Sequence, residues 1–453
     1  MSNKNISILG AGESGVGAAL LAMRKGYTPF VSDGGQILEK YKAILETEQI
    51  QWEENGHTQE RILQAEEIIK SPGIPPTIPI LQEAVKRSIP IVSEIEFAAR
   101  YTAAKMICIT GSNGKTTTTK LIYQIFKDAG FNVGLAGNVG KSLALQIAEG
   151  KRYDYYVLEL SSFQLEDMYR FHAHIAILLN ITPDHLDRYG YQMQPYVDAK
   201  MRITQNQTAD DALVYWHGDN LIREELQKHA LPCRQFPFTL QKEEGSMAYV
   251  EDGKIKFTNP ITFNLEQEEL ALRGTHNLYN SMAAGIAASL AEIKSEDIRA
   301  SLSSFQGVTH RMEQVGSIEG VTFVNDSKAT NVNACWYALD SMQTPVVLIL
   351  GGVDKGNDYS EIDELVRKKV KGLIFLGTDN SKLHAHFHDF DLPMYDSISM
   401  EDCVQKALSM SAKGDTVLLS PCCASFDLFE NMADRGNQFK EVVRNLNSSS
   451  TPQ

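Results

Sequence analysis

The hydrophobic positions of this chain fall into short apolar runs, each followed by a turn with glycine and then by residues with helical spacing. Residues 106–109 form one such run, TGSNGK follows at residues 110–115, and a helical pattern continues from there. Strand, glycine turn and helix in this order are typical of folds in which parallel strands alternate with covering helices. The pattern therefore predicts an α/β protein.

The same alternation recurs in three successive stretches, and at 453 residues the chain is too long for a single core. Apolar runs of strand length lie at 5–9, 28–32, 68–70, 89–92, 106–109, 155–160, 175–181, 321–325, 346–350, 373–376 and 417–419. We predict three α/β domains: a Rossmann-like N-terminal domain (1–93), a P-loop ATPase-like central domain (94–307) and a Rossmann-like C-terminal domain (308–453). Residues 94–101, which have helical spacing, would connect the first two.

Residues 211–272 depart from this alternation and show short strands with polar turns, among which EDGK at 251–254 predicts a β-hairpin. The stretch 276–293 is rich in alanine and has helical spacing. Asn277 and Asn280 share one face of that helix because they are three residues apart. Their two amides either bind a ligand or cap and pack the helix.

Composition narrows the choice of function and of compartment. A net charge of −14 makes a nucleic-acid surface improbable, although a local basic pocket for an anionic small molecule is still allowed. The six cysteines show no CxxC spacing, which indicates reduced thiols and gives no sign of zinc. No apolar run approaches the ~18 residues of a membrane span, and a strand begins too early for a signal peptide. We expect a cytoplasmic protein that binds no membrane.

The glycine turn after residue 109 has the composition of a phosphate-binding loop. Gly111 and Gly114 let the backbone fold around an anion, while backbone N–H groups and Lys115 supply positive charge. Thr116 places a hydroxyl where such loops ligate the magnesium of a nucleoside triphosphate. The loop is shortened, because Ile109 replaces the usual first glycine. A helix entry with an exposed lysine is the alternative, but the flanking strand and helix favour ATP.

The N-terminal segment GAGESGVG fits a dinucleotide-binding fingerprint through Gly10, Gly12 and Gly15, and Asp33 closes the second strand. Taken alone this pattern proposes NAD, yet a lone fingerprint is weak because the fold serves many ligands. Residues 71–73, Ser-Pro-Gly, predict a turn. These residue types either only provide the dihedral angles that the turn needs or place backbone N–H groups toward a ligand.

Two polar residues follow strands of the central stretch. Glu159 lies at the end of the run at 155–160, and His185 comes just after the run at 175–181. A solvated carboxylate and a packing histidine are the commoner outcomes for isolated residues. Because the carboxyl ends of parallel strands meet at one edge, beside the phosphate loop, we predict a metal site there.

Nine ordered strings lie in the predicted central and C-terminal domains: TGSNGKTTTT, AGNVG, LELSSFQLE, LNITPDHLDRY, HNLYNSMAA, HRME, VNDSKATN, GGVDKG and LLSPCCASFDLF. With these strings the chain resembles the Mur ligases of bacterial peptidoglycan synthesis. LELSSFQLE and LLSPCCASFDLF favour the member that adds D-glutamate to UDP-N-acetylmuramoyl-L-alanine. The resemblance implies an enzyme of cell-wall biogenesis, and so of cell shape and cell division.

The implied reaction is an ATP-dependent amide synthesis. The substrate carboxylate takes the γ-phosphoryl group, and the amine of D-glutamate attacks the acyl phosphate, which releases phosphate and leaves ADP as the second product. Phosphoryl transfer needs charge neutralisation and alignment more than a covalent nucleophile. The chain fits this need, since it offers cations and metal ligands without a Ser/His/Asp triad. A monomer is expected.

The resemblance implies roles for individual residues. Lys115, His185, Lys200 and Arg311 would be catalytic. ATP would be bound by Gly111, Ser112, Asn113, Gly114, Lys115, Thr116, Thr117, Asn277, Arg311, Asp326, Lys328 and Thr330. The uridine nucleotide would be bound by Ser14, Gly15, Val16, Asp33, Ser71, Pro72 and Gly73, the muramoyl part by Asn138 and His185, and D-glutamate by Lys355 and Ser425. Magnesium would be held by Thr116, Glu159, His185 and Lys200. Met432 stands where relatives carry an aromatic residue late in the D-glutamate pocket.

Lys200, in VDAKMR, matches the family's carbamylated lysine. An unmodified ammonium would repel magnesium, whereas a carbamate is anionic and can ligate it. For a lone lysine on a helix the solvated interpretation would dominate, so this assignment depends on the resemblance.

Two other classes of function compete with this reading. A P-loop ATPase that works as a switch or motor is disfavoured by the Rossmann-like domain at each end of the chain. A folate-polyglutamate ligase of similar architecture is disfavoured because the N-terminal domain would have no ligand there.

Overall fold

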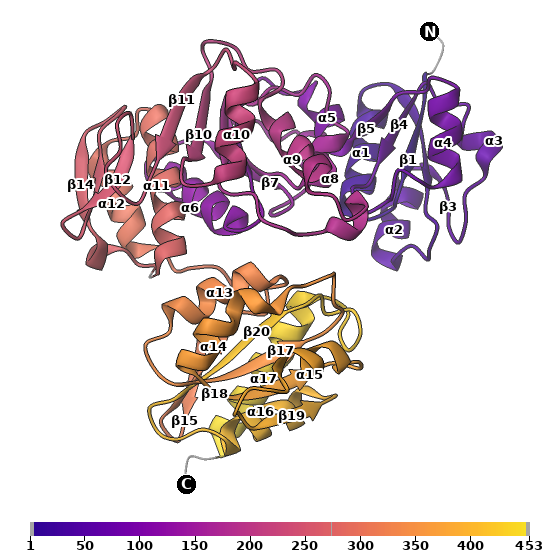
Figure 1. Ribbon diagram of the computed structural model, residues 1–453. Coiled ribbons are helices and arrows are strands. Elements are labelled where there is room, and N and C mark those ends of the chain that lie inside the picture. The colour runs from indigo at the N-terminus through magenta and orange to yellow at the C-terminus, as the bar shows by residue number, and fades with distance from the viewer. Residues whose placement is uncertain (1–3, 273, 450–453) are drawn as a thin grey trace. The chain divides into compact units, whose positions relative to one another are not determined.

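The computed structural model describes residues 4–272 and 274–449 (Figure 1). They divide into two compact units. The first contains the described residues of Met1–Ile181, Gln192–Glu269 and Tyr279–Ser303, and the second those of Thr182–Tyr191, Leu270–Leu278 and Ser304–Gln453. Within these residues no helix is long and apolar enough to cross a membrane. All six cysteines are free, as predicted.

The N-terminal sheet consists of five parallel strands in the order β3-β2-β1-β4-β5. Its elements are β1 (Lys4–Leu9), α1 (Glu13–Arg24), β2 (Tyr27–Ser32), α2 (Glu39–Thr47), β3 (Gln51–Glu53), α3 (Gln59–Ile62), β4 (Glu67–Lys70), α4 (Pro79–Lys86) and β5 (Ile91–Ser93). The strand order reverses between β1 and β4, and open α/β sheets bind ligands at such a switch point. The Rossmann-like prediction is confirmed.

The central sheet has nine strands in the order β14-β13-β12-β11-β10-β9-β6-β8-β7. Its elements are α5 (Glu94–Ala99), β6 (Lys105–Thr110), α6 (Lys115–Asp128), β7 (Val133–Gly137), α7 (Leu143–Ala148), β8 (Tyr155–Glu159), α8 (Ser162–Glu166), β9 (Ile175–Leu178), η1 (Leu186–Tyr189), α9 (Met193–Met201), η2 (Arg202–Thr204), β10 (Ala212–Trp216), α10 (Asn220–Lys228), β11 (Arg234–Phe238), β12 (Ala248–Glu251), β13 (Lys254–Phe257), β14 (Phe263–Glu266), η3 (Gln267–Glu269), α11 (Thr275–Leu290) and α12 (Ser295–Ser304). The strands from β7 to β12 run parallel, and the predicted hairpin joins β12 to β13 through two residues.

The C-terminal sheet has the order β15-β16-β20-β17-β18-β19, in which only β15 is antiparallel to its neighbour. Its elements are β15 (Glu313–Ile318), β16 (Val321–Asn325), α13 (Val332–Ser341), β17 (Val346–Gly351), η4 (Tyr359–Ile362), α14 (Asp363–Lys369), β18 (Val370–Leu376), α15 (Ser381–Phe387), β19 (Met394–Ser397), α16 (Met400–Ser409), β20 (Thr416–Cys422) and α17 (Met432–Ser449). Strand β15 was not predicted, because its sequence EQVGSI lacks an apolar run.

The alternation of side chains along β17 explains the two layers of helices around this sheet. Val346, Leu348 and Leu350 pack in one core with residues of α13, α14 and α15. Val347 and Ile349 point into a second core with residues of α16 and α17. A strand that is buried on both faces reads as a continuous apolar run, which is why the sequence pattern predicted it.

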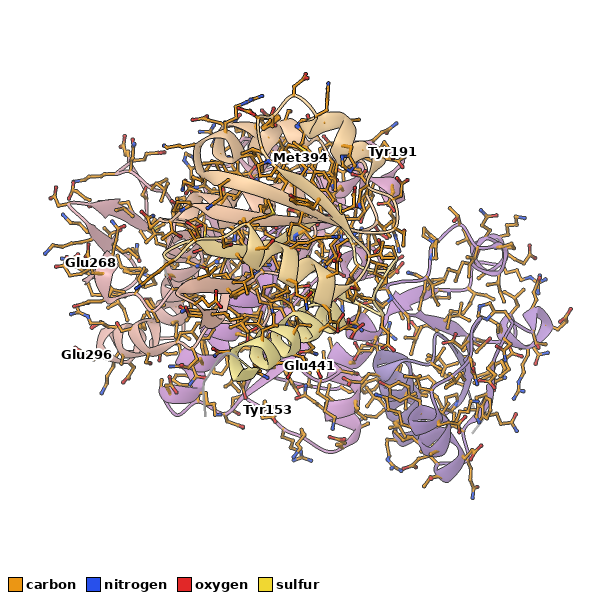
Figure 2. All side chains as sticks on the ribbon, turned by 90° about the horizontal axis from the view of Figure 1, so that it is seen from below. Tyr153, Tyr191, Glu268, Glu296, Met394 and Glu441 are labelled. Carbon is orange, nitrogen blue, oxygen red and sulfur yellow. The ribbon has the colours of Figure 1, made fainter. Side chains whose placement is uncertain are left out.

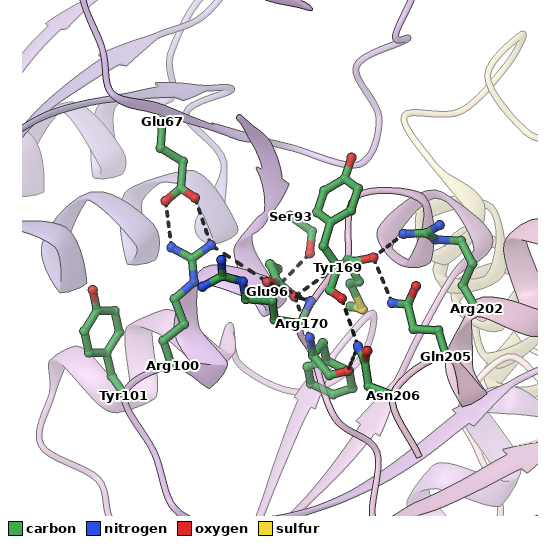
Figure 3. Close-up of polar contacts among 12 residues, drawn as sticks. Glu67, Ser93, Glu96, Arg100, Tyr101, Tyr169, Arg170, Arg202, Gln205 and Asn206 are labelled. Carbon is green, nitrogen blue, oxygen red and sulfur yellow. Dashed lines mark hydrogen bonds and ion pairs between the residues drawn. The ribbon is translucent and has the colours of Figure 1, made fainter. Parts of the chain in front are cut away.

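Two buried glutamates of α5 join the N-terminal sheet to the central one. Glu96 is 2% exposed, and its carboxylate accepts the backbone N–H groups of Tyr169, Arg170 and Phe171 at 2.8–3.2 Å (Figure 3). Oε1 of Glu94 accepts from Ser142 Oγ at 2.8 Å and from the N–H of Ala144 at 2.5 Å, at the start of α7. The connecting helix is therefore fixed inside the first compact unit.

We expect Glu94→Gln to change the pH dependence of stability. Burial raises the pKa of Glu94 from 4.5 to about 7, so the folded state holds this proton more tightly than the unfolded chain does. That stabilisation is complete below the unfolded pKa and is lost as pH rises through the folded one. Between pH 5 and 8 the wild-type free energy of unfolding should fall by roughly 2–3 kcal/mol more than that of Glu94→Gln. Urea denaturation at several pH values measures this free energy for both proteins. The same pH dependence in wild type and variant would contradict the prediction.

Candidate nucleotide and ligand site

The predicted phosphate-binding loop connects β6 to α6. Gly114 is the N-cap of α6, and its φ of 84° lies in the left-handed region that suits glycine. The ammonium of Lys115 donates to the carbonyl oxygens of Gly111 at 2.8 Å and Ser112 at 2.9 Å. The N–H groups at the start of a helix together with this ammonium form an anion site. The strand, loop and helix that the ATP prediction requires are present.

Two side chains outside the loop bind to it, one at its backbone and one at the Ser112 hydroxyl. The Asn180 amide accepts the N–H of Asn113 at 2.8 Å and donates to the Asn113 carbonyl at 3.1 Å. Oη of Tyr196 lies 3.0 Å from Oγ of Ser112. Sequence reasoning missed both residues. The available signal for Asn180 was an amide within the apolar run at 175–181.

Lys200 contacts the same loop. It lies on α9 with a side chain that is 1% exposed, so the solvated interpretation of a lone lysine is wrong here. Its Nζ donates to the carbonyl of Gly111 at 2.8 Å and lies 4.5 Å from the centre of the Tyr196 ring. Lys200 is therefore buried against the phosphate-binding loop.

Glu159 is the last residue of β8 and is 2% exposed, which excludes a solvated strand-end carboxylate. Its Oε1 accepts from Nδ2 of Asn138 at 3.0 Å, and the backbone N–H of Asn138 donates to the Glu159 carbonyl at 2.8 Å. Its Oε2 is buried and has no hydrogen-bond partner among the described residues. A buried carboxylate oxygen without a donor is costly, and a cation would satisfy it.

The N-terminal fingerprint forms one wall of a cleft of about 740 Å³, which Ser71 and Ile74 also line. A Cβ on Gly15 would lie 1.8 Å from the carbonyl oxygen of Gly10, so only glycine lets α1 approach β1 this closely. The carboxylate of Asp33 accepts the N–H groups of Ala11 and Gly35 at 2.7 and 2.9 Å. In this structure Asp33 therefore fixes the glycine loop by accepting a backbone N–H group of that loop.

Of the residues predicted for the uridine nucleotide, Asp33 and Ser71 line this cleft. Ser14 is half-buried in the first turn of α1, Gly15 and Val16 are buried, Ser71 and Pro72 are half-buried and Gly73 is exposed. The structure thus brings together the two glycine-containing turns that the sequence placed sixty residues apart.

In the second unit, Asp326 is a buried carboxylate at the end of β16. Burial raises the pKa of Asp326 to about 6, and the nearby positive charge of Arg311 partly offsets this rise. Asp326 accepts from Ser420 Oγ at 3.0 Å and from the N–H of Met312 at 3.2 Å. Nε of Arg311 is buried without a hydrogen-bond partner among the described residues. Asp326 and Arg311 therefore lie close enough for their charges to interact.

His185 and Lys355 meet through the segment 182–191, which belongs to the second unit. Asp184 Oδ1 lies 2.9 Å from Nζ of Lys355, and Asp184 Oδ2 lies 3.6 Å from Nε2 of His185. Tyr191, at the end of the segment, is 70% exposed (Figure 2). Asp184 was not predicted, because an acidic residue in a polar loop carries no signal of pairing.

Arg435, which sequence reasoning also missed, is 1% exposed and joins the loops of the second unit. Its guanidinium donates to Ser327 Oγ and to the Ser327 carbonyl at 3.0 Å each, to the Cys423 carbonyl at 3.1 Å and to the Gly351 carbonyl at 3.5 Å. Burial lowers its pKa to about 10, so it keeps its charge. The carbonyl of Met432, which begins the same helix, accepts from Ser327 Oγ at 2.8 Å.

The remaining predicted residues lie in both units. Thr116 and Thr117 are buried in the first turn of α6, in the first unit. Asn277 and Asn280 belong to different units, and Asn280 accepts from Thr118 Oγ1 at 3.1 Å, so it packs α11 on α6. Lys328 and Thr330 are half-buried and Ser425 is 2% exposed, all in the second unit. Among the described residues no group of three His, Cys, Asp or Glu side chains could hold a metal ion.

A phosphate-binding loop at the carboxyl edge of one α/β sheet and a glycine-rich cleft in another define a nucleotide-binding enzyme. The model of the Mur ligase MurD-like N-terminal domain matches residues 4–93, that of the Mur ligase middle domain residues 109–288, and that of the Mur ligase glutamate ligase domain residues 310–423. The chain belongs to the Mur ligase family.

Curated relatives match along nearly their whole length. The UDP-N-acetylmuramoylalanine–D-glutamate ligase of Bacteroides thetaiotaomicron is 62% identical over 444 residues, which is 98% of this chain and 100% of the relative. The ligase of the same name from Porphyromonas gingivalis is 54% identical over 447 residues, 98% of this chain and 99% of the relative.

Solved structures share the three-domain fold. A pseudomurein peptide ligase type C from Methanothermus fervidus has a TM-score of 0.62 at 19% identity, covering 98% of this chain and 100% of that one. A UDP-N-acetylmuramate-alanine ligase from Thermotoga maritima has a TM-score of 0.62 at 17% identity, covering 98% and 99%.

We expect Lys115→Ala to lower ATP-dependent turnover by roughly a hundredfold or more, because it removes a preorganised cation from the phosphate-binding loop. The lysine is half-buried and lies at a helix start, so the circular dichroism spectrum and melting temperature should stay close to wild type. Release of ADP measures the loss. Normal turnover by the folded variant would contradict the assignment of this loop.

Proposed function

We propose that this chain is an ATP-dependent ligase that adds D-glutamate to UDP-N-acetylmuramoyl-L-alanine during peptidoglycan precursor synthesis. The observation that carries the proposal is the 62% identity over 98% of the chain with a ligase of this name. The phosphate-binding loop and the glycine-rich cleft support it, because the reaction needs one site for ATP and another for a uridine nucleotide. The proposal includes a monomer that works in the cytoplasm, where thiols stay reduced.

The reaction proceeds in two balanced steps. An oxygen of the L-alanine carboxylate attacks the γ-phosphorus, the bond to the β-phosphate oxygen breaks, and ADP leaves. The neutral amine of D-glutamate then attacks the acyl carbonyl, phosphate leaves with the electron pair, and the amine proton is lost. Lys115 and the loop N–H groups neutralise charge on the transferred group, and Arg311 adds a second cation.

Magnesium would be held by Thr116, Glu159, His185 and Lys200 as its carbamate. The buried Glu159 Oε2 without a hydrogen-bond partner among the described residues supports a cation there. When bound, the ion offsets negative charge on the phosphates. Burial of Lys200 against the phosphate loop supports a special role for this amine, because an unmodified ammonium beside a divalent cation is unfavourable.

The substrates would take separate sites. The cleft beside Asp33 and residues 71–73 would bind the uridine nucleotide, and Asn138, bonded to Glu159, would orient the muramoyl part. Lys355 and Ser425 would bind D-glutamate. The ion pair of Lys355 with Asp184 supports this role, because the ammonium already pairs with a carboxylate.

An assay of phosphate release tests the function. Purified protein with ATP and magnesium should release phosphate only when both UDP-N-acetylmuramoyl-L-alanine and D-glutamate are present. L-Glutamate is the matched control and should give little or no release. Release that needs no UDP-linked substrate would point to a plain ATPase, and tight binding of NAD without a uridine-nucleotide signal would reverse the assignment of the N-terminal cleft.

Lys200 is expected to act as a carbamate. Lys200→Ala should lose activity, and acetate or formate should partly restore it by occupying the vacated carboxylate position. Lys200→Arg keeps a positive charge but cannot form a carbamate, so it should stay inactive. Lys228→Ala, at a half-exposed lysine on α10, is the control and should behave as wild type. Normal turnover by Lys200→Arg would disprove the carbamate.

A further inference from the structure

Lys70 is a buried lysine in the N-terminal sheet that none of the roles above uses. It is the last residue of β4 and directly precedes the turn at residues 71–73, and its side chain is only 2% exposed. Lysine is almost never this buried unless its charge is paired, because removing an ammonium from water is costly. Its position beside the cleft therefore calls for an explanation.

The ammonium of Lys70 has two partners, one in the N-terminal domain and one at the end of helix α8 of the central domain. Nζ donates to the carbonyl oxygen of Ile74 at 3.1 Å, and it lies 2.9 Å from Oδ2 of Asp167. The N–H of Ile74 in turn donates to the carbonyl of Ser71 at 3.1 Å. The turn that begins at Ser71 is thus closed by its own backbone hydrogen bond, and the bond from Lys70 to the Ile74 carbonyl holds its end.

Asp167 lies at the far end of the short helix α8, which follows strand β8 and its last residue Glu159. It is the C-cap of α8, whose N-cap Ser161 comes two residues after Glu159 and forms a capping box with Gln164. Its carboxylate is 14% exposed, and its backbone carbonyl accepts the N–H of Ser93 at 2.9 Å. A rigid one-turn helix therefore separates the partner of Lys70 from Glu159.

Other contacts between the two sheets do not reach the turn. Glu96 and Arg100 bind residues 169–171 and Glu67, as Figure 3 shows, and Glu94 binds the start of α7. These bonds fix the connecting helix. In the set of described contacts between the two sheets, Lys70 differs because it bonds to the carbonyl of a residue that lines the cleft.

We propose that Lys70 is a positioning residue for the UDP-linked substrate: its buried ion pair with Asp167 sets the turn at residues 71–74 relative to the central sheet. The inference rests on the proposed function, since the turn lines the cleft assigned to the uridine nucleotide. Lys70 itself touches no substrate. It fixes the backbone that does, and so it affects the affinity for one substrate of the three.

Direct binding measurements test the proposal. In calorimetry, Lys70→Met should weaken UDP-N-acetylmuramoyl-L-alanine about tenfold, within the range of coupling between paired groups, while ATP binding stays within about twofold of wild type. In turnover the KM for the UDP-linked substrate should rise and kcat should change little. Asp167→Leu should give a similar loss. The double variant should lose no more affinity than either single variant, since all three remove one interaction.

The controls separate positioning from simple stability. Lys86→Met changes an exposed lysine on α4 of the same domain, and it should leave all constants at wild-type values. If Lys70→Met does not fold, the double variant carries the test, because it leaves no buried unpaired charge. Unchanged substrate affinity with a lower melting temperature would show a purely structural ion pair, and losses that multiply in the double variant would also overturn the proposal. Wild-type protein that fails to bind the UDP-linked substrate would instead overturn the proposed function.

Discussion

The guanidinium of Arg435 is the contact on which the ligand loops of the second unit depend. Three loops leave the carboxyl ends of β16, β17 and β20, and each contributes a carbonyl oxygen to this one buried cation. The loops carry Asp326, Lys355 and Ser425 close to these carbonyls in sequence. Irregular backbone has few bonds of its own, and a charge-assisted donor that reaches three loops at once fixes their relative positions.

Buried or half-buried charged side chains that bond to backbone groups recur through the first unit. Glu96 accepts three successive N–H groups, Lys115 and Lys200 both donate to the carbonyl of Gly111, and Lys70 donates to that of Ile74. A buried charge without bonds destabilises a fold strongly, so each of these side chains tolerates little movement of its partner. Burying a charge without partners costs free energy, which makes such residues rare. For the same reason, a buried charge that has partners resists any movement of the loop that would break its bonds.

Charged side chains buried against backbone groups are also the feature that could not be predicted from the sequence. Strands such as β17, with apolar residues on both faces, and the loop around Lys115 follow from local patterns, and the structure contains them as predicted. Arg435 stands among polar neighbours and Lys70 ends the short run at 68–70, and a charged residue at either kind of position ordinarily faces solvent. Their burial depends in part on partners far along the chain, Asp167 for Lys70 and Ser327 for Arg435, and the hydropathy pattern carries no information about such partners. Asn180 is intermediate, because its amide interrupts an apolar run.

The predicted site residues occur in both units, and in each unit they lie on or beside loops held by such contacts. Thr116, Glu159 and Lys200 belong to the first unit, and His185, Asp326 and Lys355 to the second. Phosphoryl transfer and amide formation depend on close alignment of the reacting groups, so the loops that carry such groups must be well ordered. In the second unit Arg435 holds the loops that carry the predicted residues, and in the first unit Asn180 and Tyr196 hold the phosphate-binding loop. Within each unit these loops are therefore ordered by buried polar contacts of the protein itself.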